Sequence, residues 1–290
     1  MHMVHTRYGD LVPQRTTDDL RRKELLPVDL YEDGSPRGLP LETQVLIDTP
    51  AGVVPAEFIS FYPDGSLNRV FPLNGRLSGY WTQDDEARLS EPVSLQTPVG
   101  ELHARVISVS FYKTQALRSL TLWPGEVVSV QTPAGLIKTR TGVSFYPDGS
   151  IRSLEPAAPV AVKTPVGEIM AFDPDAVGVN GDCNSLVFNP DGSVRSLCTV
   201  SSRVTAFMPD GTRTVCCPQW RESICGDTER EITPMAILFD GGDVVIRSSA
   251  EDASVRFDGD RAVVFAGRWE GMHVARFAGM PLLPRTSCSH

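Results

Sequence analysis

Short runs of alternating apolar and polar residues recur along most of the chain. Four of them precede the phrase Thr-Pro-x-Gly, namely QVLID before 49–52, VSLQ before 97–100, VVSVQ before 132–135 and VAVK before 164–167. Alternation with a period of two, bounded by Pro and Gly, is typical of β-strands that end in tight turns. Since short turns rather than helices separate these strands, the pattern predicts antiparallel meanders and not parallel βαβ units.

A second phrase of ten residues alternates with the first. Its four clearest copies are FYPDGSLNRV at 61–70, FYPDGSIRSL at 145–154, FNPDGSVRSL at 188–197 and FMPDGTRTVC at 207–216. Proline presets φ for the first central turn position, Asp accepts hydrogen bonds from nearby backbone N–H groups, and glycine adopts the left-handed φ that strains other residues. This combination predicts a three-residue hairpin loop, a type I turn closed by a glycine bulge.

The copy at 145–154 predicts a definite strand register. The expected pairs are Tyr146–Ser150, Phe145–Ile151 and Ser144–Arg152. Phe145 and Ile151 then form an aromatic–aliphatic pair on one face of the hairpin, and Ser144 and Arg152 share the opposite face. The phrase recurs because each copy must make the same turn and the same apolar pair beside it.

Weaker copies extend the second phrase. LYEDGSPRGL at 30–39 keeps Asp-Gly-Ser, whereas FYKTQALRSL at 111–120 keeps the aromatic residues and Arg-Ser-Leu but loses the turn. LFDGGDVVIR at 238–247 and RFDGDRAVVF at 256–265 keep aromatic–Asp–Gly. The irregular spacing disfavours a strict solenoid, whose repeat length is nearly constant. The sequence predicts an all-β fold in which repeated antiparallel β-hairpins form a long twisted meander sheet with short helical insertions.

The repeats also divide the chain into segments. The expected segments are an N-terminal arm or short helix (1–27), the hairpin-repeat region (28–216) with an insertion (71–92), a Cys- and Pro-rich segment with C-terminal hairpins (217–279) and a tail (280–290). In the insertion, Thr82 is followed three positions later by Asp85, which predicts a capping box and one or two helical turns.

Length and composition favour a globular protein and disfavour nucleic-acid-binding, membrane-spanning and secreted proteins. A chain of 290 residues with 41% hydrophobic residues can bury a sizeable core. Its formal charge of −9 disfavours general nucleic-acid binding, which needs a basic face. The sequence has neither an apolar run long enough for a membrane span nor the apolar core of a secretory signal. Six cysteines without such a signal favour free thiols in a reducing cytoplasm.

FYPDGSIRSL resembles the hairpin unit of bacterial MORN-type repeats, in which aromatic residues and Asn/Asp-Gly lead to an aliphatic residue and Lys or Arg. The stretch FAGRW at 265–269 also resembles the opening of a MORN unit, with Gly271 one position early. The resemblance covers the hairpins and not the Thr-Pro-x-Gly phrases. It implies an extended, curved antiparallel sheet that acts as a binding or scaffolding surface without catalytic residues. A second resemblance, to the YD repeat of large surface and toxin shells, fits a longer and secreted chain.

Five of the six cysteines cluster in one part of the chain, at Cys183, Cys198, Cys216, Cys217 and Cys225. Thiolates ligate zinc and iron–sulfur clusters, so a metal-binding or redox protein is one alternative. We expect Cys183 and Cys198 to lie near each other across a hairpin, and the adjacent Cys216 and Cys217 to point to opposite faces of a strand. Since the C-x-x-C knuckle is missing and free cysteine often serves as a small apolar residue, the sequence favours a protein without a cofactor.

Aromatic residues and arginine in the interruptions of the repeat suggest a partner-binding surface. Tyr80 and Trp81 lie in the first interruption, and Trp220 and Arg221 lie in the second. Tyr, Trp and Arg are enriched at the hot spots of protein interfaces. The competing interpretation is that these large aromatic side chains cover the core.

Signals for catalysis are weak. The sequence has no G-x-S-x-G elbow, and His103 and His273 lie in expected strands without a patterned partner. The aspartates of DPDAVGVNGD at 173–182 lack the ligand order of an EF-hand. The sequence therefore predicts a non-catalytic, cytoplasmic scaffold or protein-interaction module with a protein partner. The alternatives are a metal or redox protein at the cysteines and an enzyme with a site beside 71–92.

Overall fold

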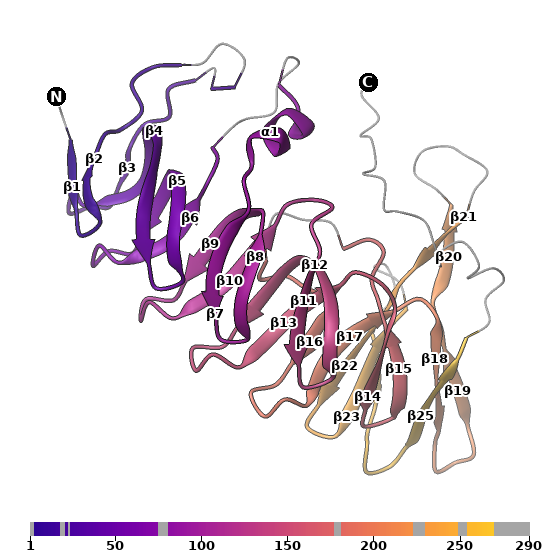
Figure 1. Ribbon diagram of the computed structural model, residues 1–290. Helices are drawn as coiled ribbons and strands as arrows, with labels where there is room; N and C mark the ends of the chain where they lie inside the picture. Colours follow the sequence, from indigo (N-terminus) through magenta and orange to yellow (C-terminus); the bar gives the residue numbers. More distant parts are fainter. Residues whose placement is uncertain are drawn as a thin grey trace. The chain divides into compact units, whose positions relative to one another are not determined.

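The computed structural model describes residues 3–17, 21–22, 24–74, 81–176, 181–222, 230–248 and 254–269 (Figure 1). The chain divides into two compact units. Unit 1 comprises Met1–Val128, Thr141–Ser150 and Val179–Asp182. Unit 2 comprises Ser129–Arg140, Ile151–Gly178 and Cys183–His290.

Antiparallel β-strands make up almost all of the regular structure, so the predicted all-β fold is confirmed. Unit 1 contains β1 (Val4–Thr6), β2 (Gly9–Leu11), β3 (Asp29–Leu30), β4 (Pro36–Thr49), β5 (Gly52–Phe61), β6 (Leu67–Phe71), β7 (Val93–Thr97), β8 (Gly100–Ala104), β9 (Val106–Phe111), β10 (Leu117–Leu122) and the helix α1 (Gln83–Leu89). The strands β11 (Val128–Thr132) and β12 (Gly135–Phe145) contain residues of both units.

The strands of unit 2 are shorter on average and include the C-terminal hairpins. They are β13 (Ile151–Pro156), β14 (Val160–Thr164), β15 (Gly167–Ala171), β16 (Leu186–Phe188), β17 (Val194–Thr199), β18 (Ser202–Phe207), β19 (Arg213–Cys216), β20 (Gln219–Glu222), β21 (Arg230–Thr233), β22 (Met235–Asp240), β23 (Asp243–Arg247), β24 (Val255–Phe257) and β25 (Val263–Arg268).

Fourteen strands belong to one meandering sheet, as the alternation of short strands and turns predicts. Its order is β24-β23-β22-β17-β16-β13-β12-β10-β9-β6-β5-β4-β3, and β11 pairs with β12 off this path. The other strands form the pairs β1–β2, β7–β8, β14–β15 and β20–β21 and the three-stranded sheet β19-β18-β25. The sequence pattern did not predict these separate sheets, because alternation shows that a strand has one buried face but not which sheet it joins.

The Pro-Asp-Gly phrase forms the predicted hairpin turn. The Tyr146 N–H donates to the Ser150 carbonyl at 2.8 Å, and the Gly149 N–H donates to the Tyr146 carbonyl at 2.9 Å. Gly149 has a φ of 88°, the left-handed conformation that the turn requires. Asp148 Oδ1 accepts hydrogen bonds from both the hydroxyl and the N–H of Ser150, and these bonds lower the pKa of Asp148.

Beyond the turn, the strand register of three other copies departs from the pattern predicted for the copy at 145–154. In the hairpin of β5 and β6, Phe61 pairs with Leu67 as expected for the apolar pair, but Ser60 pairs with Arg69 and not with Asn68. The hairpins β9–β10 and β16–β17 show the same shift by one residue. A β-bulge therefore follows the apolar pair in these three copies, while the pairs predicted for the copy at 145–154 stay a prediction.

The copy at 111–120 also keeps its turn, although the sequence predicted that the turn would be lost. Gln115 takes the place of glycine with a φ of 68°, and its N–H donates to the Tyr112 carbonyl at 2.8 Å. The Gln115 side chain donates to the Leu67 carbonyl and accepts a hydrogen bond from the hydroxyl of Tyr8. These tertiary contacts hold a backbone conformation that is unfavourable for most residues other than glycine.

The two repeated phrases contact each other at their turns. In the Thr-Pro-x-Gly turn of β7–β8, the Thr97 hydroxyl donates to the Gly100 carbonyl at 2.6 Å. A Cβ at Gly149 of a Pro-Asp-Gly turn would lie 3.2 Å from the Cβ of Pro98. In unit 2, Gly192 approaches Pro133 equally closely. Glycine at these positions therefore serves both the turn and the close contact with the other phrase.

Tyrosine side chains tie successive hairpins of unit 1 together. The hydroxyl of Tyr62 donates to the Phe111 carbonyl at 2.9 Å, and the hydroxyl of Tyr112 donates to the Phe145 carbonyl at 2.8 Å. Phe111 and Phe145 are fully buried. Of the two aromatic residues that open the phrase, phenylalanine therefore packs in the core and tyrosine hydrogen-bonds to the next hairpin.

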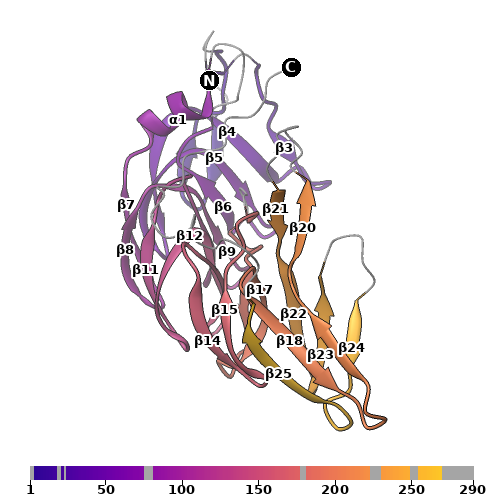
Figure 2. The same ribbon diagram turned by 90° about the vertical axis from the view of Figure 1, so that its right-hand side faces the viewer.

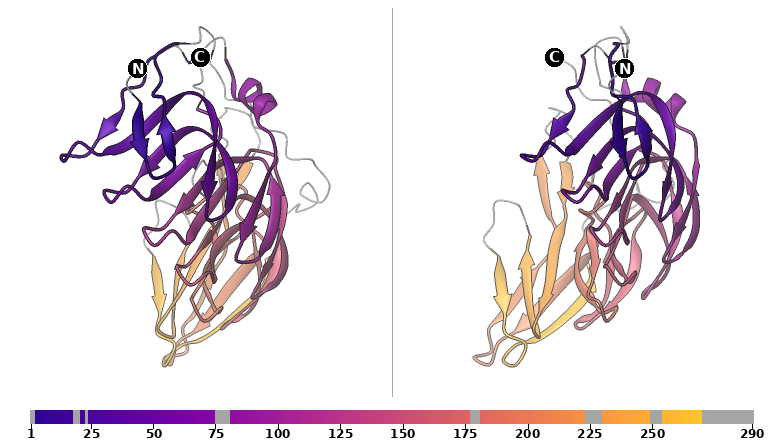
Figure 3. Two further views of the ribbon diagram at one scale, coloured as in Figure 1. Left: turned by 60° about the vertical axis from the view of Figure 1, so that its left-hand side comes forward. Right: turned by 90° about the vertical axis from the view of Figure 1, so that its left-hand side faces the viewer.

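The predicted capping box begins the helix α1. Thr82 is the N-cap, and its side chain and backbone exchange hydrogen bonds with Asp85. At the N-terminus, the described part of 1–27 contains the hairpin β1–β2 and no helix (Figure 3). Within the residues that the structure describes, no helix combines the length and the apolar character of a membrane span.

Candidate interaction surface

Trp81 lies in a buried polar network beside α1. Its Nε1 donates to Glu86 Oε2 at 2.7 Å. Arg21 Nη2 lies 2.5 Å from Glu57 Oε2 and 3.6 Å from Glu86 Oε1. Burial opposes the charge of Arg21, but its hydrogen bond and attraction to Glu57, together with Glu86, raise its pKa. Trp81 therefore helps to hold α1 on unit 1, while Tyr80, its predicted partner in binding, lies outside the described residues.

One cavity borders the described part of the 71–92 insertion. An open cavity of about 310 Å³ is lined by Leu26, Pro27, Phe58, Phe71 and Asn74. These side chains carry no titratable group. His103 lies on β8, where its Nδ1 is 3.1 Å from the Ser94 hydroxyl and exposed to solvent.

Trp220 and Arg221 lie on β20 and have different surroundings. Trp220 is exposed, and its ring centroid is 6.4 Å from that of Trp269. Arg221 Nη2 lies 2.8 Å from Asp175 Oδ2 and 3.1 Å from Glu231 Oε2. Trp220 is thus available to a partner, whereas the charge of Arg221 is already compensated.

The cysteines of unit 2 are separated by their secondary structure. Cys183 precedes β16 and lies in no strand, so the expected placement of Cys183 and Cys198 on facing strands is wrong. Burial raises the pKa of the Cys198 and Cys216 thiols, which keeps both protonated at neutral pH. Cys217 follows β19 and is half-buried, and Cys225 lies outside the described residues. Among the residues described, no three His, Cys, Asp or Glu side chains are grouped to hold a metal ion.

The aspartates at 173–182 each have their own surroundings. Asp182 Oδ2 lies 3.0 Å from Arg118 Nη2 and 3.8 Å from Arg69 Nη2. Asp175 pairs with Arg221. Burial raises the pKa of Asp173. Among the described residues, these aspartates belong to no group of three His, Cys, Asp or Glu side chains that could hold a metal ion.

Glu155 on β13 is a fully buried carboxyl group that sequence reasoning missed. Its two oxygens accept hydrogen bonds from the N–H and the hydroxyl of Ser185, at 2.8 and 2.9 Å. Burial raises the pKa of Glu155 from 4.5 to about 7, although the hydrogen bonds from Ser185 lower it. The neighbouring Asp173 raises the same pKa further, and Arg140 lowers it. No sequence motif marks this position, because its burial depends on the segment that contains Ser185.

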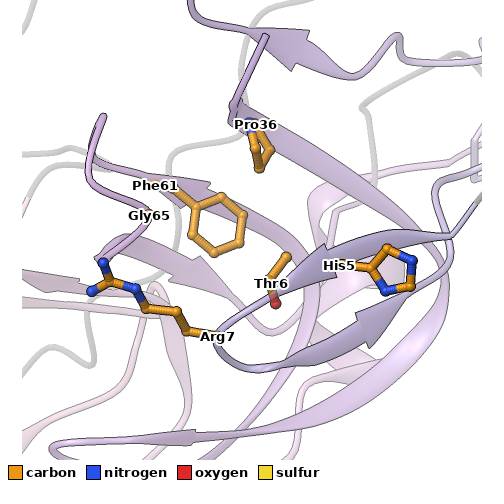
Figure 4. A pocket seen from close by; sticks show the side chains of 6 residues that line it. All are labelled: His5, Thr6, Arg7, Pro36, Phe61 and Gly65. Atoms are coloured by element: carbon orange, nitrogen blue, oxygen red, sulfur yellow. The ribbon is translucent and has the colours of Figure 1, made fainter. Parts of the chain in front are cut away.

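A pocket of about 360 Å³ lies in unit 1, beside the hairpin β1–β2. It is lined by His5, Thr6, Arg7, Pro36, Phe61 and Gly65. Figure 4 shows the ring of Phe61 and Pro36 facing Thr6 across it. His5 Nδ1 is engaged by Asp10 Oδ1 at 2.6 Å. Pro36 and Phe61 form the apolar part of the lining, and His5 and Arg7 are its two ionisable side chains.

The strands β19, β18 and β25 form a three-stranded sheet (Figures 1 and 2), and four of the exposed large apolar residues lie on it. The register places Thr205 opposite both Val215 and Phe265, and Phe207 opposite Val263. Directly paired residues share a face, so these five side chains point to the same side.

The apolar side chains of this face are exposed although they are large. The exposed fractions are 69% for Val263, 44% for Phe265, 44% for Val215 and 40% for Phe207. The rings of Phe207 and Phe265 stack with centroids 5.7 Å apart. A contiguous apolar patch of this kind is typical of a surface that binds another molecule. We call these four residues and the buried Thr205 between them the outer apolar face.

Comparisons with protein-family models, with curated proteins and with solved structures found no match. The function therefore has to be argued from the chain's own geometry.

Arginine is the only charged residue type on the three strands of this sheet. Arg213 pairs with Phe207 and lies 6.0 Å from the centre of its ring, a cation–π arrangement. Arg203 and Arg268 are exposed on β18 and β25. Among the described residues, none of the three arginines forms an ion pair. Arg203 and Arg213 lie on the same side of the sheet as the outer apolar face, because they pair with Gly267 and Phe207, whereas Arg268 pairs with Ser202 on the opposite side.

Proposed function

We propose that the protein is a non-catalytic protein-interaction module and that the outer apolar face is its binding surface. The exposure of Phe207, Val215, Val263 and Phe265 on one side of a regular sheet carries this proposal. The remaining hairpins act as the scaffold that holds this sheet, which agrees with the binding role that a MORN-like resemblance implies. A cytoplasmic location remains part of the proposal.

The composition of the face supports protein binding more than catalysis. Aromatic side chains and arginine are enriched at the centres of protein interfaces, and a ring of polar groups commonly surrounds them. The outer apolar face carries no titratable side chain, whereas catalytic sites need a concave arrangement of titratable groups. Trp220 is a further exposed aromatic residue of unit 2.

The test compares proteins captured from host extract by the wild type and by the double variant Val263→Thr, Phe265→Thr. Threonine keeps the preference for β-strands while it removes apolar surface. We expect a stoichiometric partner that the wild type retains and this variant loses. The matched control is Leu46→Thr, Val53→Thr, which removes two exposed apolar residues from the hairpin β4–β5.

Retention of the same partner by the control and its loss from the face variant would support the proposal. Equal capture by the wild type and the face variant, with both folded by circular dichroism, would show that the outer apolar face is not the binding surface. Loss from the control alone would move the surface to β4–β5 in unit 1.

A further inference from the structure

The strand β19 has a free edge. The order of its sheet is β19-β18-β25, and in the part of the chain that the structure describes no strand pairs with the second edge of β19. The strand contains Arg213, Thr214, Val215 and Cys216, and it has no proline or bulge that would block pairing. A free edge of this kind presents unpaired backbone N–H and C=O groups that a further strand can bind.

The hydrogen-bonding pattern of the hairpin β18–β19 determines which backbone groups of β19 point to its free edge. The Met208 N–H donates to the Thr212 carbonyl at 2.9 Å, which makes 208 and 212 a hydrogen-bonded pair. Hydrogen-bonded and non-hydrogen-bonded pairs alternate along an antiparallel ladder. Phe207–Arg213 and Thr205–Val215 are therefore non-hydrogen-bonded pairs. The N–H and C=O groups of Arg213 and Val215 consequently point away from β18 and toward the free edge.

The same two residues place their side chains on the outer apolar face. Arg213 and Val215 are both exposed and lie two positions apart on one face of the strand. A strand added at this edge would place residues two positions apart directly beside them. A carboxylate beside Arg213 would meet a cation that has no ion-pair partner among the described residues. An apolar side chain beside Val215 would extend the face formed by Phe207 and Phe265.

We propose that β19 binds an extended peptide as an additional strand, and that this peptide carries a carboxylate and an apolar side chain two positions apart on one face. The inference rests on the proposed function and adds the class of its partner. Main-chain hydrogen bonds to Arg213 and Val215 supply affinity, and the alternate side chains supply specificity, as in other cases of strand addition.

Charge favours an acidic peptide over a second copy of this chain. The strands β18, β19 and β25 carry Arg203, Arg213 and Arg268 and no Asp or Glu. Pairing of β19 with its own copy would bring two sets of these arginines together without an opposite charge on either sheet. Such a pairing would leave Arg213 of each copy without a carboxylate beside it.

The experiment uses the full chain and a labelled peptide, Thr-Val-Thr-Phe-Thr-Glu-Thr, with fluorescence anisotropy as the readout. The key variant is Val215→Pro, with Val215→Thr as its matched control. Proline removes the N–H that points to the free edge and leaves the bonds to β18 in place, because edge strands tolerate proline there. We expect Val215→Pro to bind the peptide about tenfold more weakly than Val215→Thr.

A second test exchanges the charges of the peptide and of Arg213. It examines the proposed pairing of Arg213 with a carboxylate and does not depend on the folding of the proline variant. A second peptide carries Lys in place of Glu. We expect the wild type to prefer the Glu peptide by about tenfold and Arg213→Glu to prefer the Lys peptide. Higher salt should reduce both preferences, because the groups are exposed.

The outcomes separate this inference from the proposed function. Equal binding of the peptide by folded Val215→Pro and Val215→Thr, or an unchanged preference in Arg213→Glu, would overturn strand addition at β19. The outer apolar face would still be a binding surface if Val263→Thr, Phe265→Thr loses its captured partner. A wild-type dimer that Val215→Pro dissociates would identify a second copy as the occupant and overturn the acidic peptide.

Discussion

The hairpin β7–β8 of unit 1 and the sheet β19-β18-β25 of unit 2 have similar inner faces and different outer faces. Both bury one set of alternate side chains, which are Val93, Leu95, Leu102 and Ala104 in the first and Val204, Ala206 and Cys216 in the second. The outer residues of β7–β8 are the polar Ser94, Gln96, Glu101 and His103. The outer residues of the three-stranded sheet are mainly the apolar Phe207, Val215, Val263 and Phe265.

The turns of the two regions differ as well. Pro98, in the turn of β7–β8, lies against Gly149 of a Pro-Asp-Gly turn. Gly211, in the turn of β18–β19, has nothing within 4 Å of the position where a Cβ would lie. Met208 also stands where other copies have the tyrosine that binds the next hairpin. The hairpin β18–β19 thus keeps the turn of the repeat without the close turn contact made by Gly149, and β18 pairs instead with the distant strand β25.

The largest effects should come from the inner faces, where the two regions are alike. We expect Leu95→Ala to lower the free energy of unfolding by about 2–5 kcal/mol, because it leaves a cavity in the core. Val204→Ala should cost about 1–3 kcal/mol, because fewer methyl groups are lost. Urea unfolding measures both, with Gln96→Ala and Arg203→Ala as exposed controls within about 0.5 kcal/mol of wild type. A neutral Val204→Ala would show that β18 does not pack on a core.

The next largest effect should be a difference between the two units in how their stability depends on pH. The pKa of Glu155 in unit 2 is raised to about 7, so the folded state binds this proton more tightly than the unfolded state. The resulting stability is present below 4.5 and is lost as the pH rises through about 7. We expect unit 2 to lose about 2–3 kcal/mol between acid and alkaline pH. In unit 1, hydrogen bonds from Ser66 lower the pKa of Asp64, so its contribution is lost only at acid pH.

Urea unfolding at about pH 5 and about pH 8.5 measures this difference in the wild type and in Glu155→Gln. Glutamine can keep hydrogen bonds to Ser185 without a titrating proton. The variant should therefore be less sensitive to this change of pH than the wild type. An equal pH dependence in both proteins would assign the effect to other groups, such as Asp173.

The tyrosine contacts should give a smaller difference. Tyr62→Phe removes the hydroxyl that donates to the Phe111 carbonyl and should cost about 0.5–1.5 kcal/mol. Met208→Leu changes the equivalent position of β18–β19 and should be nearly neutral, since it conserves side-chain volume. Thermal unfolding followed by calorimetry measures both. A Met208→Leu variant as unstable as Tyr62→Phe would show that Met208, like Tyr62, makes a specific contact with a neighbouring hairpin.

The outer faces should change surface properties with little effect on stability. We expect Val263→Thr, Phe265→Thr to reduce the fluorescence of bound anilinonaphthalene sulfonate, which reports exposed apolar surface. Ser94→Val, His103→Phe should increase it by making β7–β8 resemble the three-stranded sheet. Both variants should unfold within about 0.5 kcal/mol of wild type. No change in dye binding from the first variant would mean that the outer apolar face is covered in solution.

Most of the fold was predictable because it depends on local chemistry. Alternating residues, Thr-Pro-x-Gly and Pro-Asp-Gly determine strands and turns through φ and short-range hydrogen bonds, and Thr82 with Asp85 determines the start of α1. The bulge after Phe61–Leu67 and the retained turn at Gln115 were missed, because both depend on neighbours distant in sequence. The burial of Glu155 was missed for the same reason.

The candidate surface was less predictable than the fold. Sequence reasoning selected aromatic residues in the interruptions, and of these Trp81 is engaged by Glu86 while Trp220 is exposed. Phe207 and Phe265 were instead classed with the repeats, where the first aromatic residue is usually buried. Their strands are distant in the chain and pair only in the folded protein.

By itself, the sequence determined that this chain is an antiparallel β protein and where most of its turns lie, since period-two alternation and turn residues act over a few positions. Only the tertiary structure decided which strands form separate sheets and which side of each remains exposed. The reason is that exposure depends on what packs against a strand. Val263 is an apolar, β-branched residue, and in the structure it is 69% exposed because no described segment covers its face.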